Sequence, residues 1–361
     1  MINITMVAGA RPNFIKLAPI VWACEKAVQN GKEIKLTTVF TGKEDDPTVE
    51  ASLFNDLGMK RPDVFLGVES ESLNELTGQV MGAFDRYLDT TPADVVIVVD
   101  DLASTMAVAI VCKKRGIRLA HLVAGTRSFD FTMPKEVNRL VIDGLSDLLF
   151  TAGAGASSIV SREGAELQKV YMVGNIIIDT LRHNLPRFTR PSSLESLGID
   201  DGGYVVFTIN RKALLSDNEY IKALLQTISD NIGQMPVVAP LRGLARSVIE
   251  PLAGRFPGLH IVDSMSYLDF GYLTTHAMGI ITDSGNIAEE ATFSNVPCIT
   301  LNDYTEHIET VSQGTNTLVG SDLVKLQKAL ADMVAGQWRT TVLPDRWDGR
   351  TADRILQIVT E

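Results

Sequence analysis

Residues that would point to a disulfide framework, a membrane span or a nucleic-acid partner are scarce in this chain of 361 residues. Its three cysteines, Cys24, Cys112 and Cys298, have neither metal-site spacing nor a disulfide pattern, so we expect a reducing, cytoplasmic setting. No apolar run reaches the roughly 18 residues that a membrane helix needs. A net charge of -11 argues against general nucleic-acid binding, although a nucleotide ligand needs only a local positive site.

The composition is that of a globular protein, and apolar runs alternate with helical patterns along the chain. The first residues, 1–7, lack a basic flank and lead into Gly9-Ala10-Arg11, which is typical of a first core strand and not of a signal peptide. The run Val95–Val99 is continuous and β-branched, as in a strand buried on both faces of a parallel sheet. We predict further strands at 4–7, 36–40, 119–123, 148–150, 170–173, 205–208, 236–239, 259–262, 279–282 and 298–301.

Residues 187–203 interrupt this alternation and are interpreted as an interdomain linker or hinge, because prolines, serines and a double glycine gather there. The chain is therefore predicted to be an α/β protein with two consecutive doubly wound halves and a cleft between them. Ligands of such sheets bind outside the carboxyl ends of the strands. Most of the conspicuous polar residues follow a predicted strand: Arg11, Lys16, Asp101, Arg127, Glu136, Asn210, Ser284 and Glu290.

The stretch Asp283–Ala291 follows an apolar run and opens a helix, which is a suitable arrangement for an anion site. Ser284 and Gly285 would let a phosphate approach the backbone closely, and Glu290 could reach a ribose hydroxyl. An ordinary helix N-cap has the same pattern, so the turn alone does not decide between the two interpretations.

Several segments together resemble the non-hydrolysing UDP-N-acetylglucosamine 2-epimerases. They begin with Gly9-Ala10-Arg11-Pro12-Asn13-Phe14-Ile15-Lys16 and keep their order and spacing over nearly the whole chain at 120–139, 174–181, 283–291, 297–301, 305–306 and 314–320. The resemblance implies two Rossmann-like domains facing a cleft, as in glycosyltransferases of the B type. It implies that residues 1–182, joined by a C-terminal helix at about 350–361, form the first domain, and that residues 183–349 form the UDP-binding domain.

Members of this family interconvert UDP-GlcNAc and UDP-ManNAc, by a reaction that resembles elimination of UDP and its re-addition on the other face of C2. The resemblance implies a UDP or UDP-sugar ligand, no cofactor, no metal, a homodimer formed through the first domain and a place in polysaccharide biosynthesis. It assigns UDP and its phosphates to Arg11, Lys16, Ser284, Gly285, Asn286 and Glu290. Asn286 replaces a glycine of the family, and its side chain would obstruct a phosphate that packs against that glycine.

The chain departs from the family where the family carries ionisable groups. Val123 and Lys135 replace glutamates, Asn210 replaces a histidine, and Asp100-Asp101 replaces a Gly-Asp pair. Valine and asparagine cannot exchange a proton near neutral pH, and losing one positioned acid or base typically costs about 10²–10⁴ in rate. We place Val123, Arg127, Lys135 and Asn210 in the sugar pocket, and retain Asp101 and, more weakly, Glu136 as catalytic candidates.

Each candidate also has a purely structural interpretation. Asp101 could cap the helix that follows it, and Glu136 could be an ordinary helix-start carboxylate. His121 is expected to be a satisfied core histidine, and His307 to lie on the surface of a loop. Three hypotheses stay open: an active epimerase, an enzyme of different chemistry on another nucleotide sugar, and a silent homologue that binds UDP or a UDP-sugar, also as the partner of an active paralogue. We expect UDP-sugar binding with ordinary epimerase activity severely impaired or absent.

Overall fold

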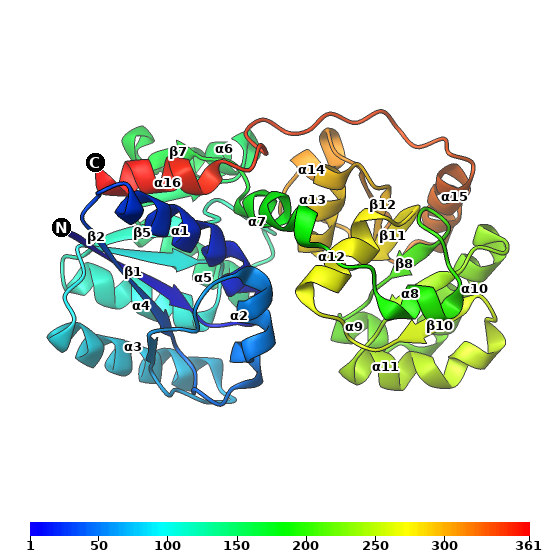
Figure 1. The fold of residues 1–361 in the computed structure, drawn as a ribbon, viewed down its shortest axis with the longest axis horizontal. Helices are drawn as coiled ribbons and strands as arrows, with labels where there is room; N and C mark the ends of the chain where they lie inside the picture. Colours follow the sequence, from blue (N-terminus) through cyan, green and yellow to red (C-terminus); the bar gives the residue numbers. More distant parts are fainter. The chain divides into compact units, whose positions relative to one another are not determined.

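The computed structural model describes residues 1–361, which fold as two compact units. Unit 1 comprises Met1–His183 and Asp345–Glu361, and unit 2 comprises Asn184–Pro344. Each unit is built on one parallel sheet, and in unit 1 the helices cover both faces of that sheet (Figure 1). The predicted fold class, α/β with two doubly wound domains, is confirmed.

Unit 1 has a seven-stranded parallel sheet in the order β3-β2-β1-β4-β5-β6-β7. Its strands are β1 (Ile2–Ala8), β2 (Ile34–Phe40), β3 (Val64–Phe65), β4 (Val95–Val99), β5 (Arg118–Leu122), β6 (Leu148–Thr151) and β7 (Val170–Met172). Its helices are α1 (Arg11–Gln29), α2 (Ala51–Leu57), α3 (Leu73–Thr90), α4 (Ala103–Lys114), α5 (Pro134–Leu145), α6 (Ala154–Arg162), α7 (Ile176–Asn184) and α16 (Thr351–Thr360), with 3₁₀ turns at Pro47–Val49 and Leu167–Lys169.

Unit 2 has a six-stranded parallel sheet in the order β10-β9-β8-β11-β12-β13. Its strands are β8 (Val205–Phe207), β9 (Val237–Pro240), β10 (Leu259–Val262), β11 (Gly279–Thr282), β12 (Cys298–Thr300) and β13 (Asn316–Leu318). Its helices are α8 (Ser192–Leu197), α9 (Lys212–Leu215), α10 (Asn218–Ile232), α11 (Gly243–Ile249), α12 (Tyr267–Thr275), α13 (Gly285–Ser294), α14 (Glu309–Ser312) and α15 (Leu323–Val334), with 3₁₀ turns at Leu185–Arg187 and Glu250–Arg255.

The strands predicted from apolar runs are all present, and β4 has the predicted bounds. All five β4 side chains are buried, because the strand lies inside the sheet with helices on both faces. Two strands escaped prediction, β3 and β13, which are only two and three residues long. The interpretation of residues 187–203 as a linker is wrong in part, since this segment contains α8 and inserts Leu194 into the core of unit 2.

The last segment of the chain completes unit 1. Trp347 is 1% exposed, and its Nε1 donates to the carbonyl of Ala152 over 3.1 Å. The carboxylate of Asp179 in α7 accepts from the Ala352 N–H at 2.8 Å, which anchors the start of α16. Helix α16 then packs along α1, at the other end of the sequence (Figure 1). Gly174 allows this return, because a Cβ there would lie 2.1 Å from the Arg346 carbonyl oxygen.

The two sheets share the same strand topology. The chain fills each sheet outward from its first strand in one direction and then in the other, so the direction changes between β1 and β4 in unit 1 and between β8 and β11 in unit 2. In open parallel sheets, ligands bind at this topological switch point, outside the carboxyl ends of the strands. The turns that follow these four strands are therefore the candidate ligand-binding turns of the two units.

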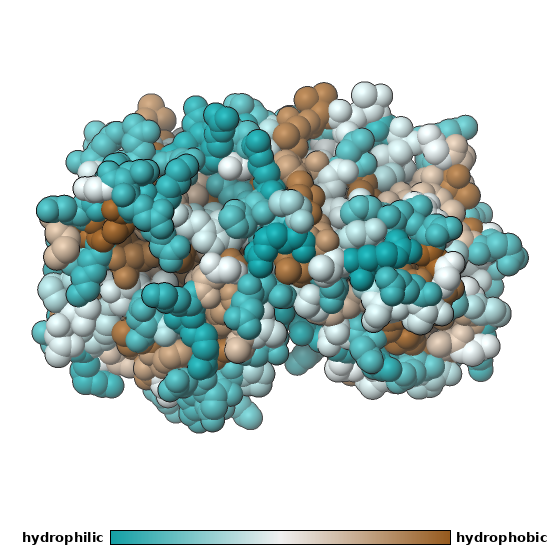
Figure 2. Space-filling model, viewed as in Figure 1, coloured by the Kyte–Doolittle hydropathy of each residue, from teal (hydrophilic) through white to brown (hydrophobic).

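The outer surface is mixed in character. Figure 2 shows a largely hydrophilic face interrupted by small hydrophobic patches. No helix combines the length and the apolar character needed to cross a membrane.

We expect Trp347→Ala to lower the free energy of unfolding by about 3–5 kcal/mol, because it removes a large, fully packed side chain that joins the C-terminal segment to unit 1. Leu167→Ala is the control in the same unit, since Leu167 is 80% exposed and its truncation should change stability by less than about 0.5 kcal/mol. Equilibrium urea unfolding followed by far-ultraviolet circular dichroism measures both. Equal midpoints for the two variants would contradict the proposed anchoring.

Candidate functional site

In unit 1, the turn after β1 lies next to the turn after β4, because the two strands pair in parallel. Gly9 begins the first turn, and a Cβ there would lie 2.3 Å from the Ser104 hydroxyl oxygen. The close approach of Gly9 to the start of α4 thus explains the glycine at this position. A cavity of about 360 Å³ opens beside it, lined by residues that include Gly9, Thr41, Lys43, Asp46, Glu69 and Ser104.

The two cations predicted to bind phosphate both have carboxylate partners in unit 1. Arg11, at the start of α1, forms an ion pair with Glu50. Lys16, one turn further on, forms a buried ion pair with Asp100, which also accepts from the Asn13 side-chain amide at 2.8 Å. Sequence reasoning did not select Asp100 as a site residue. The sequence feature that could have identified Asp100 is an aspartate directly after the buried run Val95–Val99, where the resemblance led us to expect a glycine.

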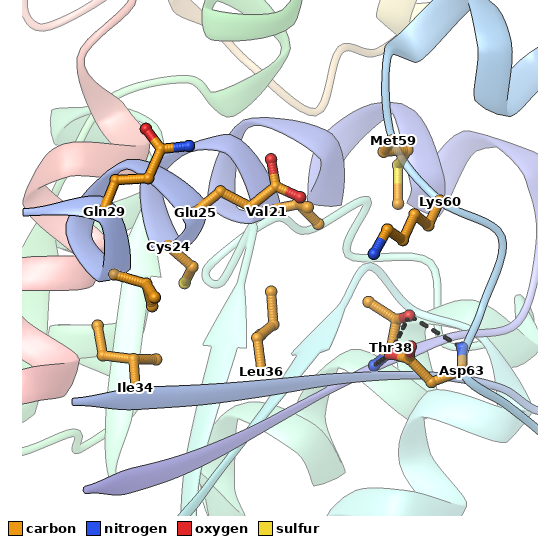
Figure 3. Close-up of a pocket in the computed structure, with 11 residues that line it drawn as sticks. Val21, Cys24, Glu25, Gln29, Ile34, Leu36, Thr38, Met59, Lys60 and Asp63 are labelled. Atoms are coloured by element: carbon orange, nitrogen blue, oxygen red, sulfur yellow. Dashed lines mark hydrogen bonds between the residues drawn. The ribbon is translucent and has the colours of Figure 1, made fainter. Parts of the chain in front are cut away.

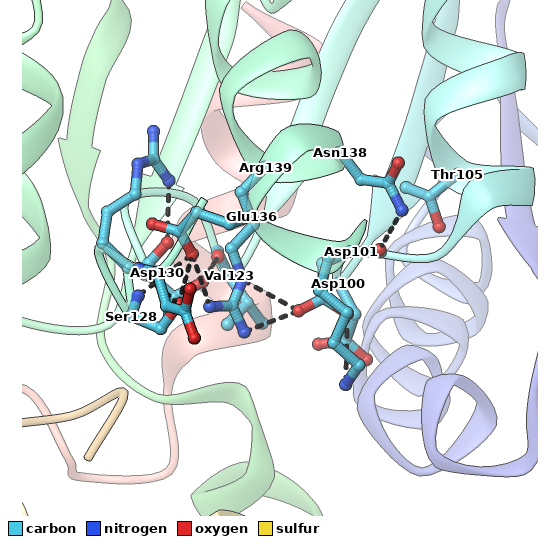
Figure 4. Close-up of polar contacts among 12 residues, drawn as sticks. Asp100, Asp101, Thr105, Val123, Ser128, Asp130, Glu136, Asn138 and Arg139 are labelled. Atoms are coloured by element: carbon cyan, nitrogen blue, oxygen red, sulfur yellow. Dashed lines mark hydrogen bonds and ion pairs between the residues drawn. The ribbon is translucent and has the colours of Figure 1, made fainter. Parts of the chain in front are cut away.

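Asp101, the catalytic candidate, is 8% exposed and held by cations (Figure 4). The Arg139 guanidinium donates to its Oδ2 from Nε at 2.8 Å and lies 2.6 Å away through Nη2. The Lys135 ammonium lies 3.6 Å from the other carboxylate oxygen. Both oxygens of the Asp101 carboxylate therefore face a cation.

Glu136 anchors the loop that precedes α5. Its carboxylate accepts from the backbone N–H groups of Ser128 and Phe129, both at 3.0 Å, from the Ser128 hydroxyl at 2.9 Å and from Arg139 at 3.1 Å (Figure 4). Burial would raise the pKa of Glu136, but these hydrogen bonds outweigh it and lower the pKa below its usual value. The geometry therefore supports the helix-start interpretation of Glu136.

Val123 has a left-handed backbone with φ of +71°, which is rare for a β-branched residue. Gly125, two residues on, has φ of +79°, and a Cβ there would come within 2.4 Å of the Ala156 carbonyl oxygen. Backbone strain of this kind often gathers at functional sites, where surrounding structure maintains it.

A buried polar network of His121, Asp143, Arg127 and Glu163 packs against the loop between β5 and α5. His121 contacts Asp143 through Nδ1 at 2.6 Å and the Asp100 carbonyl through Nε2 at 2.9 Å, so it is the satisfied core histidine that was expected. Arg127, predicted to line the sugar pocket, has a guanidinium that is 1% exposed and paired with Asp143 and Glu163. Its contacts are those of a residue that holds the loop in place.

Unit 2 places the turns after β8 and β11 side by side. The Asp283 carboxylate accepts from the backbone N–H groups of Asn210 and Arg211, both at 2.7 Å. Asp283 thus ties the two turns together across the switch point. The Asn210 side chain is left exposed, and its amide does not titrate.

The start of α13 remains open. Ser284 precedes the helix and makes no side-chain cap, and a Cβ on Gly285 would meet nothing within 4 Å. Asn286 lies in the helix without a left-handed backbone, so no conformational demand for glycine exists at this position. The first turn of α13 therefore has the free space and the helix-dipole field that an anion site requires.

Glu290 and its neighbours lie deeper in unit 2. Burial, followed by the charge of Glu289, raises the pKa of Glu290 to about 8, so its carboxyl is largely protonated at neutral pH. A protonated carboxyl can both donate and accept hydrogen bonds. His307, expected on a loop surface, is instead 5% exposed and lies 3.6 Å from Glu289, so that expectation was wrong.

Another cavity, of about 550 Å³, lies in unit 1 between α1 and β2 (Figure 3). Cys24, Leu36 and Met59 line it, and at its margin Asp63 accepts from the Thr38 N–H at 2.7 Å. Burial, and to a lesser degree Glu25, raises the pKa of the Cys24 thiol to about 12, so this thiol is protonated and unreactive at neutral pH. None of the predicted site residues lines this cavity.

Comparison with known proteins connects the chain to one family. Residues 26–360 match the model of the UDP-N-acetylglucosamine 2-epimerase family. A UDP-N-acetylglucosamine 2-epimerase of Methanocaldococcus jannaschii is 31% identical over 371 residues, which cover 99% of each chain. A crystal structure of such an enzyme from M. jannaschii, in complex with UDP-GlcNAc and UDP, matches with a TM-score of 0.85 at 30% identity and 99% coverage of each chain.

Two further likenesses are informative. The UDP-2,3-diacetamido-2,3-dideoxy-D-glucuronate 2-epimerase of Pseudomonas aeruginosa is 30% identical, over 94% of this chain and 92% of its own. A lipopolysaccharide outer core galactosyltransferase, at 12% identity, has a TM-score of 0.57 over 99% of this chain and 100% of its own. That last likeness concerns the fold alone, and it agrees with the glycosyltransferase-like architecture expected from the sequence.

The raised pKa of Glu290 makes stability depend on pH. The unfolded carboxyl ionises at about 4.5 and the folded one at about 8, so the folded state binds the proton more tightly and stability falls as pH rises between these values. We expect Glu290→Gln to raise the melting temperature at pH 9 and to have little effect at pH 4.5.

Differential scanning fluorimetry across this pH range measures the effect. Glu195→Gln, at an exposed position of unit 2, is the matched control and should show no such trend. A Glu290→Gln variant that is destabilised equally at every pH would overturn the assignment of a buried, protonated carboxyl.

Proposed function

This chain belongs to the UDP-N-acetylglucosamine 2-epimerase family, and we propose that it binds UDP or a UDP-sugar while its ordinary 2-epimerase activity is severely impaired or absent. The observation that carries the proposal is a contrast within the molecule. The α13 turn of unit 2 is open to an anion, whereas the carboxylates kept at the switch point of unit 1 are held by cations and backbone N–H groups.

Nucleotide binding is supported by the geometry of unit 2. Ser284, Gly285 and Asn286 begin α13, where backbone N–H groups and the helix dipole favour a phosphate. Glu290, on the same helix, supplies a protonated carboxyl suited to a pair of ribose hydroxyls. Arg11 and Lys16 could join a phosphate only after exchanging their carboxylate partners, Glu50 and Asp100.

Impaired catalysis is supported by the chemistry of the groups that remain. A base that removes the C2 proton must be free to accept it and within reach of it. Asp101 is engaged by Arg139 and Lys135, and Glu136 is occupied by loop N–H groups. Val123 and Asn210 offer no titratable group, so none of these four positions supplies a free base at neutral pH.

Activity on another nucleotide sugar is the second candidate, and Lys135 is the observation that favours it. Its side chain is 62% exposed, and its ammonium is a positive charge where the family carries a glutamate. The P. aeruginosa relative acts on a glucuronate derivative, a sugar that bears a carboxylate. Lys135 could pair with the carboxylate of such a sugar. The sugar of UDP-GlcNAc carries no charge, so only its phosphates could pair with Lys135.

We also propose a cytoplasmic setting, with the chain acting as a homodimer or as the partner of an active paralogue. The three cysteines are free and buried, which suits a reducing compartment.

We expect UDP to raise the melting temperature of the protein, because ligand binding to the folded state stabilises it by mass action. Ser284→Trp should abolish this shift by filling the open turn before α13, and Ser321→Trp, at an exposed position of unit 2, should preserve it. Thermal shift titrations with UDP and with uridine separate the phosphate contribution from that of the base. A shift retained by Ser284→Trp would place the nucleotide elsewhere.

We expect no conversion of UDP-GlcNAc to UDP-ManNAc at a rate near that of ordinary family members. The triple variant Val123→Glu/Lys135→Glu/Asn210→His restores three titratable groups and should raise the rate by at least about 10²-fold. The same triple variant with Asp101→Asn added should lose that gain. A proton NMR time course in D₂O follows both UDP-sugars. Rapid incorporation of deuterium at C2 of the sugar by the unmodified protein would contradict the proposal of a silent active site.

A further inference from the structure

The turn after β1 and the turn before α13 are both rich in anion-binding groups, but the molecule uses these groups differently. In unit 1, the N–H groups of Gly9 and Ala10 donate to the Asn13 side-chain oxygen at 2.9 Å and 3.1 Å. Pro12, in the first turn of α1, has no N–H to offer. At the start of α13, by contrast, no side chain caps the helix.

The positive charges next to the β1 turn, those of Lys16 and Arg11, are each paired with a carboxylate of unit 1. The Lys16 side chain is 8% exposed, and it pairs with Asp100, whose side chain is 16% exposed. Arg11 pairs with Glu50 at a more exposed position. A buried ion pair has little net charge, so it attracts a phosphate far less than a free ammonium does.

Asp100 is held firmly in this position. Its backbone is left-handed, with φ of +58°, a conformation that glycine adopts without strain and that other residues adopt at a cost. The Asn13 amide and the Lys16 ammonium fix its carboxylate, and its carbonyl contacts His121. Strain of this kind persists only where the surrounding contacts maintain it.

We propose that Asp100 is an intramolecular anion that occupies the phosphate position of the β1 turn and thereby sets the ligand specificity of unit 1. With Asp100 in place, the Lys16–Asp100 pair selects an uncharged polar part of the ligand, such as sugar hydroxyls, and strong phosphate binding is confined to the α13 turn. The inference deepens the proposed function and rests on it for the identity of the ligand, but the charge compensation itself can be tested with inorganic pyrophosphate.

The test compares pyrophosphate and UDP binding by isothermal titration calorimetry in the unmodified protein, Asp100→Asn and Asp100→Gly. Both variants remove the carboxylate charge that compensates Lys16, and a charge-assisted hydrogen bond from a buried cation should tighten pyrophosphate binding by about 10-fold or more. Asp100→Gly also relieves the left-handed strain, so it should melt above Asp100→Asn while showing the same gain in affinity. This gain should shrink at high ionic strength.

Three controls accompany these variants. Asp85→Asn removes one of the two carboxylates that pair with Arg115, a cation elsewhere on unit 1, and should leave pyrophosphate affinity unchanged. Lys16→Gln in the otherwise unmodified chain leaves the Asp100 carboxylate without its cation and should weaken pyrophosphate binding. The double variant Lys16→Gln/Asp100→Asn removes both charges of the pair and should bind pyrophosphate within about twofold of the unmodified protein. The double variant keeps the test decisive even if Asp100→Asn alone fails to fold.

The outcomes distinguish this inference from the proposed function. Unchanged or weaker pyrophosphate binding in folded Asp100→Asn or Asp100→Gly overturns the inference, as does a large loss of affinity in Lys16→Gln/Asp100→Asn. UDP binding by the unmodified protein would still support the proposed function. A gain of pyrophosphate binding in the variants, without any UDP binding by the unmodified protein, would uphold the inference and refute the proposed function.

Discussion

One carboxylate in each unit bridges the point where the sheet changes direction, and the turns that form the candidate site depend on it. Asp283 binds the backbone N–H groups of the turn after β8, and Asp100 binds Lys16 and Asn13 from the turn after β1. The two bridges have opposite consequences. Asp283 holds backbone and leaves the adjacent helix start open, whereas Asp100 neutralises a cation and leaves its own turn without free charge.

The fold could be predicted from the sequence to the extent that local patterns determine it. Continuous apolar runs mark buried parallel strands, and for β4 the run Val95–Val99 predicted the bounds as well. Strands β3 and β13 were missed because two or three residues carry no periodicity. Residues 187–203 were misjudged because prolines and glycines signal a break in regular structure but do not show whether the segment packs, as Leu194 does.

The site was predicted less completely, because the roles of its residues depend on partners far away in the sequence. The position of Glu136 in a helix start was foreseeable, but its contacts with the N–H groups of Ser128 and Phe129 depend on how the preceding loop folds back. The left-handed backbone of Val123 could not be predicted from the sequence, because a β-branched residue normally avoids that conformation. His307 stands in a polar segment, and only tertiary packing brings it against Glu289 in the interior.

The order of the chain through the two units has a consequence for biosynthesis. Unit 2 is inserted into unit 1, whose Trp347 and α16 follow unit 2 in the chain and are synthesised after it. All of unit 2 can therefore be folded while unit 1 still lacks one of its helices and a buried tryptophan. An emerging chain would expose the part of α1 that α16 covers until α16 has been synthesised, so the unit that is begun first is completed after the other.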